Sequence, residues 1–289
     1  MKKQIGSLYQ FLLTLLAIVC LIIASQMMIL KVSLLSTTHW EKTTETSGYT
    51  KALTETINQG IQDLGLASGI TADGLEQVIK EEQVAQDFNH FLENTLNGAP
   101  YMVKQDDIKK GISDAITAYA DKTGKAIDAS NQESVNEFVN QAYHIYDRSI
   151  RNKIISTFGL RINLINQASN MVLYGSLILL AVLLLFNYLA ADRYTHVFVR
   201  NLAYLFSSSS MLLLLSSYLF YRYNPIRSLS IFDDNLNNWL FEGFKQPQLL
   251  NISLCGVFLV IGIGLSIFSY KSYKQLELRG FRRERKQRG

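Results

Sequence analysis

The sequence predicts an all-α membrane protein: four transmembrane helices, with a helical extracytoplasmic domain inserted between the first and the second. Four apolar stretches are each long enough to cross a hydrocarbon core about 30 Å thick, which takes about 20 residues of helix. They are residues 11–30, 171–190, 202–221 and 250–270, and none contains Asp, Glu, Lys, Arg or His. Between the first two stretches, apolar residues recur at spacings of three and four, the pattern of amphipathic helices.

The distribution of positive charge predicts the orientation of the spans, because Lys and Arg near span ends are retained on the cytoplasmic side. Two lysines precede the first stretch, Arg193 and Arg200 flank the turn between the second and third, and the tail carries eight Lys and Arg against two Glu. Both termini are therefore expected in the cytoplasm. The absence of cysteine from the outer region favours a bacterial plasma membrane over a secretory-pathway membrane.

These features divide the chain into nine segments. In order they are a cytoplasmic N-terminus (1–10), the first span (11–30), the extracytoplasmic helical domain (31–170), the second span (171–190), a short cytoplasmic turn (191–201), the third span (202–221), a second outer loop with an amphipathic helix (222–249), the fourth span (250–270) and a basic cytoplasmic tail (271–289). The first span is expected to stay as a signal anchor, because its apolar run is too long for a signal peptide.

The outer domain is expected to resemble a four-helix bundle with an acidic surface. Residues 37–168 carry twelve Lys and Arg against eighteen Asp and Glu, a net charge of −6, which argues against a nucleic-acid partner. The first helix is expected to end at Gly65, and the second to begin after a cap at Thr71 and to stop at residues 97–100. The third is expected to end at Gly124. Four such helices can bury one core.

The fourth helix is expected to begin at residue 130 and, if it is one helix through residue 191, to tie the outer domain rigidly to the membrane helices. It would start with a capping box at residues 130–133, in which the Ser oxygen accepts from the third helical amide and the Glu reaches back. Its outer part carries a buried stripe that includes Ile154 and Phe158, and its inner part is the second span. At about 1.5 Å per residue, one such helix is about 90 Å long.

Three candidate contact residues lie on the outer part of that helix. His144 and Asp147 are three residues apart and are expected to pair on the helix surface. Arg148 belongs to a local basic patch with Arg151 and Lys153, which suits contact with lipid head groups.

The fourth candidate outer contact is Trp239, in the second outer loop. Ser230 and Asp233 stand at capping spacing, and Phe232, Leu236, Trp239 and Leu240 fall on one helix face. This helix either lies at the outer membrane interface, where Trp is favoured, or docks on the base of the outer domain.

Polar and small residues in the spans are expected to pack helices together rather than to carry chemistry. Gly262, Ser266 and Ser269 form a small-residue seam that suits packing within the chain or pairing between copies in a homo-oligomer. The amides Gln26 and Asn187 are expected to make interhelix contacts.

The basic tail is expected to contact membrane lipids. Its densest part is formed by Arg282, Arg283, Arg285 and Lys286. Each basic residue near an anionic inner leaflet contributes about 1 kcal/mol. A cytoplasmic partner protein is the alternative contact.

The sequence favours a non-catalytic protein without a cofactor or metal. It contains no His-x-x-x-His, His-Glu-x-x-His or Cys-x-x-Cys spacing and no Gly-rich phosphate loop. Membrane-embedded hydrolases and ion pumps need ionisable groups at depth, which these spans do not have. The expected role is a sensor, scaffold or accessory protein, whose outer domain binds a ligand or an envelope protein. The layout of an outer helical domain between two spans is one that bacterial sensor domains use.

Two other functions stay open. A large outer loop after the first span, a short inside turn, a small outer loop and a basic tail are similar in topology to four-span permeases of the cell-division and macrolide-exporter type. That similarity implies a membrane subunit of a transport or mechanical-coupling complex, with an ATPase bound at residues 191–200. The third function is a membrane enzyme with a site between the outer domain and the spans, against which the missing ionisable groups count.

Overall fold

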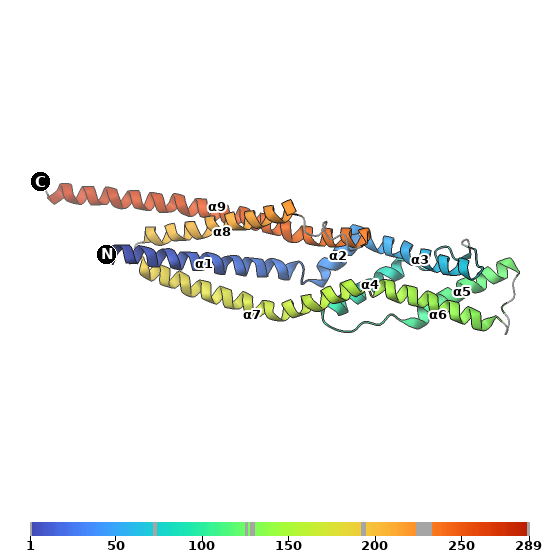
Figure 1. Ribbon diagram of the computed structural model, residues 1–289. Helices are drawn as coiled ribbons and strands as arrows, with labels where there is room; N and C mark the ends of the chain where they lie inside the picture. Colours follow the sequence, from blue (N-terminus) through green and yellow to red (C-terminus); the bar gives the residue numbers. More distant parts are fainter. Residues whose placement is uncertain are drawn as a thin grey trace. The chain divides into compact units, whose positions relative to one another are not determined.

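The computed structural model describes residues 2–71, 74–124, 127, 131–191, 195–223 and 233–287, with side chains from 8 to 275. The chain is 88% helix, and the described residues contain no strand. The helices are α1 (Lys2–Val32), α2 (Thr37–Ser47), α3 (Tyr49–Ala67), α4 (Glu81–Leu96), α5 (Gln105–Thr123), α6 (Gln132–Ile150), α7 (Lys153–Ala190), α8 (Thr195–Tyr223) and α9 (Asp234–Gln287) (Figure 1). The predicted all-α class is thus confirmed.

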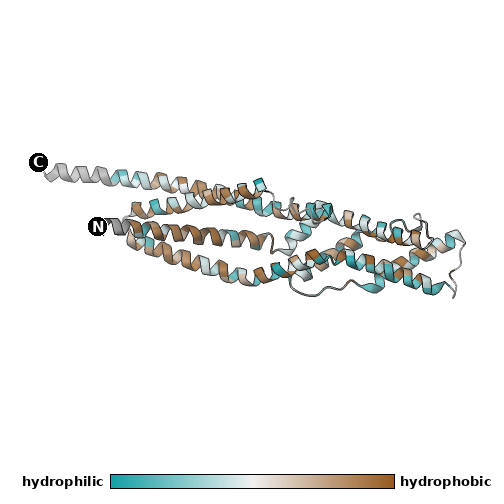
Figure 2. Cartoon of the chain, viewed as in Figure 1, coloured by the Kyte–Doolittle hydropathy of each residue, from teal (hydrophilic) through white to brown (hydrophobic). Residues whose placement is uncertain are grey.

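The chain forms two compact units. The membrane unit consists of Met1–Ser33, Asn166–Ser228 and Phe244–Gly289, and the bundle unit of Leu34–Ile165 and Leu229–Gly243. Four helical stretches are long and apolar enough to cross a membrane, and they support the predicted multi-pass membrane protein. Figure 2 shows hydrophobic residues concentrated along α1, α8, the later part of α7 and the middle of α9.

Two apolar clusters hold the helices of the membrane unit together. Leu13, Ala17 and Cys20 of α1 pack with Leu183 and Leu205. A second cluster joins α8 and α9 and contains Leu213, Cys255 and Phe258. Both cysteines are free and buried, one in each cluster.

The bundle unit is built around an aromatic core that the sequence only partly predicts. Trp40 and Trp239 are each 1% exposed, and their ring centroids are 4.7 Å apart. Trp40 lies on α2, a helix not predicted from the sequence. Tyr49 and Phe88 complete the cluster, with ring centroids 5.6 and 6.0 Å from Trp239.

Residues 132–190 form two helices and not one, because the helix is interrupted at Arg151 and Asn152. Arg151 ends α6 with a non-helical φ of −85° and ψ of 54°, and the side-chain oxygen of Asn152 accepts from the amide of Ile154 to start α7. The interruption changes which residues face the core: Ile155 is 3% exposed, whereas Ile154, predicted in the buried stripe, is 38% exposed. Ser130, in the predicted capping box, lies outside the described residues.

The second predicted helix begins later than expected, at Glu81 instead of after Thr71. Leu75 and Ile79 are still buried, but from the non-helical segment that precedes α4. The amide of Asn58 holds this segment: it donates to the carbonyl of Ile79 at 2.9 Å and accepts from the Ile79 N–H at 3.0 Å. In the segment before α4, the Asn58 side chain therefore makes the backbone hydrogen bonds that a helix would otherwise supply.

The helix predicted in the second outer loop is the first part of α9, which continues through Pro247 into the fourth apolar stretch. Leu236, Trp239 and Leu240 are buried, and the Trp239 indole N–H donates to Thr44 Oγ1 at 3.0 Å. Of the two alternatives, this helix therefore docks on the bundle. Ser230 and Phe232 lie outside the described residues.

Candidate functional site

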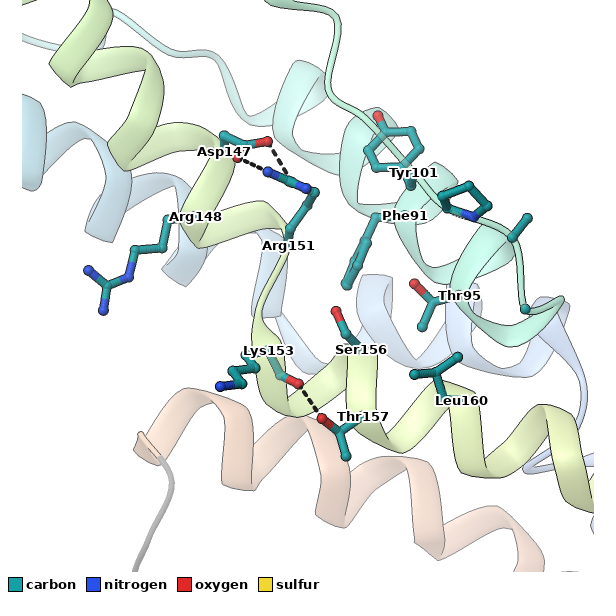
Figure 3. A pocket seen from close by; sticks show the side chains of 13 residues that line it. Phe91, Thr95, Tyr101, Asp147, Arg148, Arg151, Lys153, Ser156, Thr157 and Leu160 are labelled. Atoms are coloured by element: carbon teal, nitrogen blue, oxygen red, sulfur yellow. Dashed lines mark hydrogen bonds and ion pairs between the residues drawn. The ribbon is translucent and has the colours of Figure 1, made fainter.

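A groove of about 700 Å³ lies beside the break between α6 and α7. Its walls come from α4, from the segment between α4 and α5, from the end of α6 and from the start of α7. It is lined by apolar residues (Phe91, Ala99, Pro100, Leu160), hydroxyl residues (Thr95, Tyr101, Ser156, Thr157), Gly98, and four charged residues (Asp147, Arg148, Arg151, Lys153). Figure 3 shows the side chains of Arg148 and Lys153 on one side of the chain and those of Phe91, Tyr101 and Thr95 on the other.

An ion pair across one helical turn stabilises the break. Arg151 donates from Nε to Asp147 Oδ1 at 2.7 Å and from a terminal nitrogen to Oδ2, and its backbone N–H donates to the Asp147 carbonyl at 2.9 Å. The hydrogen bond with Asp147 raises the pKa of the Arg151 guanidinium. Arg151 is therefore charged and held in position, and the Asp147 carboxylate balances its positive charge.

A second carboxylate holds the opposite wall of the groove. Asp87 on α4 accepts from the Tyr101 hydroxyl at 2.9 Å and from the Tyr146 hydroxyl at 2.6 Å. Burial, followed by the hydrogen bond to Asp87, raises the pKa of both tyrosines well above the usual range. Both hydroxyls therefore stay protonated, and Asp87 ties the α4–α5 segment to α6.

Gly159 sets how closely α7 approaches α4. A side-chain carbon at this position would overlap the methyl group of Thr95 and lie 3.1 Å from the Thr95 carbonyl oxygen. Because Thr95 and Leu160 both line the groove, this close approach fixes the end of the groove away from the break.

The four predicted outer contact residues differ in their exposure and in their partners. Arg148 is exposed and lines the groove. His144 is exposed beside Tyr143, with ring centroids 5.7 Å apart. The predicted surface pair of His144 with Asp147 is not formed, because Asp147 is buried and pairs with Arg151. Trp239 is 1% exposed, so its assignment as an outer contact is corrected to a core residue.

The predicted small-residue seam lies against α8. A side-chain carbon at Gly262 would come within 3.1 Å of the Ser207 amide nitrogen, and Ser269 donates to the His196 carbonyl at 2.9 Å. Ser266 donates to the Gly262 carbonyl of its own helix. Arg282, Arg283, Arg285 and Lys286 lie in the last part of α9, where the structure describes the backbone alone.

The amides of the membrane unit connect helices. Gln26 donates to Asn251 at 3.0 Å, and Asn251 donates to Ser216 at 3.2 Å and Ser217 at 3.0 Å. These bonds join α1, α8 and α9.

A second amide group joins α1, α7 and α8. Asn187 donates to Thr14 at 2.9 Å and accepts from Asn201 at 2.8 Å. Both groups resemble interhelix contacts that hold a bundle together, and neither lines a groove described above.

Three residues of these sites are missing from the sequence-based candidates. Tyr146 could have been found, because it continues the four-residue spacing of Phe138 and Ala142 on the buried face of α6. Asn251 could also have been found, since it lies inside the fourth apolar stretch. Asp87 carries no such signal, because its role depends on two tyrosines distant in sequence.

The groove has the groups of a binding site for an anion. Its lining contains no His or Cys, and its one carboxylate is engaged by Arg151. Among the described residues, no group of three His, Cys, Asp or Glu side chains could hold a metal ion. The chain belongs to the class of multi-pass helical membrane proteins. No protein-family model, curated protein or solved structure gave a significant match to it.

Proposed function

We propose that the protein is a non-catalytic multi-pass membrane protein whose bundle unit lies outside the cytoplasm and binds a ligand or an envelope partner. The observation that carries this proposal is the groove at the α6–α7 break, which places Arg148, Arg151 and Lys153 together in a domain of net negative charge. A cleft lined by charges of one sign raises the local concentration of ions of the opposite sign, so these cations favour contact with an anionic group.

The continuity of α7 supports a sensing or accessory role. This helix carries groove residues near its start and the second apolar stretch at its end. The break at Arg151 and Asn152 is where α7 begins. A ligand that contacts Arg148 and Lys153 touches both sides of the break, and its binding energy can therefore favour one geometry of the interruption over another.

The orientation is tested by labelling single cysteines in intact cells after Cys20 and Cys255 have been replaced. Ala118→Cys on α5 and Gln275→Cys on α9 are both at exposed positions. A membrane-impermeant maleimide should label Ala118→Cys in intact cells, and Gln275→Cys only after the cells are opened. The reverse pattern would show that the bundle unit is cytoplasmic.

The binding role is tested by cross-linking the tagged full-length chain in its native membrane. The chain should capture a ligand or partner that the double variant Arg148→Gln, Lys153→Gln does not capture. Equal capture by both chains would show that the groove is not the site. Capture of an ATPase through a cross-linker at Arg200 would favour the transport-complex alternative.

A further inference from the structure

We propose that the groove at the α6–α7 break binds an amphiphile: an anionic phosphate or carboxylate head joined to an apolar chain. This inference rests on the proposed binding role of the bundle unit and names the chemical class of the ligand. The volume of about 700 Å³ lies within the range of small-molecule sites, about 300–1,000 Å³.

The charged side of the groove is suited to an anionic head. Three cations and one carboxylate line it, and that carboxylate is already paired with Arg151. Arg148 precedes the break and Lys153 follows it; both are exposed, and their side chains extend to the same side of the chain (Figure 3). The fork of a guanidinium binds phosphate or carboxylate oxygens in pairs, and an ammonium adds a point charge.

The hydroxyl groups of Tyr101, Ser156 and Thr157 add little to recognition of that head, because their hydrogens are already donated. Ser156 donates to the Asn152 carbonyl and Thr157 to the Lys153 carbonyl, both within α7 or at its start. Tyr101 donates to Asp87. Selectivity for an anion must therefore come from Arg148, Lys153 and the terminal nitrogens of Arg151.

The other side of the groove offers apolar surface for a chain. Pro100 and Leu160 line the groove and are exposed, Leu160 at 58%, whereas Phe91, which also lines it, is only 3% exposed. Leu164, one turn further along α7, is 66% exposed and extends the same helix face. Exposed leucines at a spacing of four beside a groove form an apolar strip that an acyl or alkyl chain can cover.

The membrane itself can supply such a ligand. Met171, where the second apolar stretch begins, comes eleven positions after Leu160, and a chain of that length spans at most about 40 Å. Bilayer phospholipids of net negative charge carry an anionic head and apolar chains, and soluble amphiphiles carry the same two parts. The test below separates these two sources.

The probe is hexyl phosphate, titrated by calorimetry into the full-length chain in phosphatidylcholine nanodiscs, with inorganic phosphate and hexanol as part-ligands. The variant is Arg148→Gln, Lys153→Gln. Its matched control is Lys51→Gln, Lys110→Gln, which removes two exposed charges from α3 and α5 outside the groove.

Hexyl phosphate should bind at least tenfold more tightly than inorganic phosphate or hexanol. The groove variant should lose at least tenfold in affinity, and the control should change less than twofold. Equal binding of inorganic phosphate would show that the apolar side contributes nothing. Equal binding by the groove variant would show that the cations contribute nothing. Either result overturns the proposal.

Nanodiscs that contain an anionic phospholipid identify the source. If the bilayer supplies the ligand, the anionic lipid competes with hexyl phosphate for the groove. Hexyl phosphate should then bind the unmodified chain more weakly in nanodiscs that contain the anionic lipid than in nanodiscs of phosphatidylcholine alone. If a soluble amphiphile is the ligand, the affinity is the same in both nanodiscs. Both outcomes support an amphiphile site.

The experiments can contradict the proposed amphiphile without contradicting the proposed binding role of the bundle unit. If the groove variant loses its captured partner in cells while hexyl phosphate does not bind, the binding role stands and the amphiphile is wrong. If neither measurement responds to the groove variant, both proposals are wrong.

Discussion

The carboxylate of Asp147 and the guanidinium of Arg151 pair across the last turn of α6, at the residue where that helix ends. Asp147 is 8% exposed, whereas the Arg151 side chain is 42% exposed. The pair therefore joins a buried anchor to a cation that still reaches the groove. It stabilises the end of the helix and orients one of the groove's positive charges.

Replacement of the buried anchor should weaken the bundle. Asp147→Asn keeps the shape of the side chain but removes its charge, and it should lower the free energy of unfolding by about 1–2 kcal/mol. The melting temperature of the purified chain should fall by a few degrees. Glu137→Gln, an equal charge change at an exposed position of α6, should leave it unchanged. Equal melting of both variants would mean that the ion pair contributes nothing.

The bundle should lose stability at alkaline pH. Tyrosine ionises near pH 10 in an unfolded chain, while burial raises the pKa of Tyr101 and Tyr146 in the folded state. Above pH 10 the unfolded state therefore binds fewer protons than the folded state, and the free energy of unfolding falls as pH rises. This contribution is fully present below pH 10.

The double variant Tyr101→Phe, Tyr146→Phe separates these groups from the other tyrosines. At neutral pH it should be less stable by about 1–3 kcal/mol, because Asp87 loses two hydrogen-bond donors. Between pH 9 and 11 its melting temperature should fall less steeply than that of the unmodified chain. An identical pH slope would contradict the assignment.

Two glycine-to-alanine changes in the bundle should have opposite signs. Gly159→Ala puts a methyl group into Thr95 and should destabilise by about 1–3 kcal/mol. Gly111→Ala on α5 meets nothing within 4 Å and should stabilise by about 0.5–1 kcal/mol, because alanine is the better helix former. Melting curves of the two variants measure both effects, and a stabilising Gly159→Ala would mean that α4 and α7 do not touch there.

The amide of Asn251 should matter to the membrane unit. Asn251→Leu removes bonds to Gln26, Ser216 and Ser217, and it should lower stability by about 1–2 kcal/mol in detergent unfolding. Ser253→Ala, two residues further, removes a bond within α9 itself and should change stability by less than half that amount. An Asn251→Leu variant that is as stable as the unmodified chain would show that packing alone holds α1, α8 and α9 together.

The four apolar stretches and most helix ends could be predicted, because length, hydropathy and glycine carry local signals. Gly98 and Gly124 adopt positive φ at or just beyond the ends of α4 and α5, as their positions in the sequence indicate. The break at Arg151 and Asn152 could not be predicted from apolar spacing, since Ile154 continues the stripe across it.

The candidate site was predictable only in part. Arg148, Arg151 and Lys153 stood out as a basic patch, because they are close together in sequence. Their apolar counterpart, Phe91 and Pro100, comes from a helix and linker more than 40 residues earlier. Periodicity reports which face of a helix is buried, but it does not report which distant helix covers that face.

The docking of Trp239 against Trp40 also sets an order for synthesis. The bundle unit contains Leu229–Gly243, which the ribosome makes only after the third apolar stretch. Until then Trp40, Tyr49 and Phe88 lack the indole that covers them. A nascent chain that stops short of residue 239 therefore lacks the indole ring that completes the aromatic core of the bundle unit.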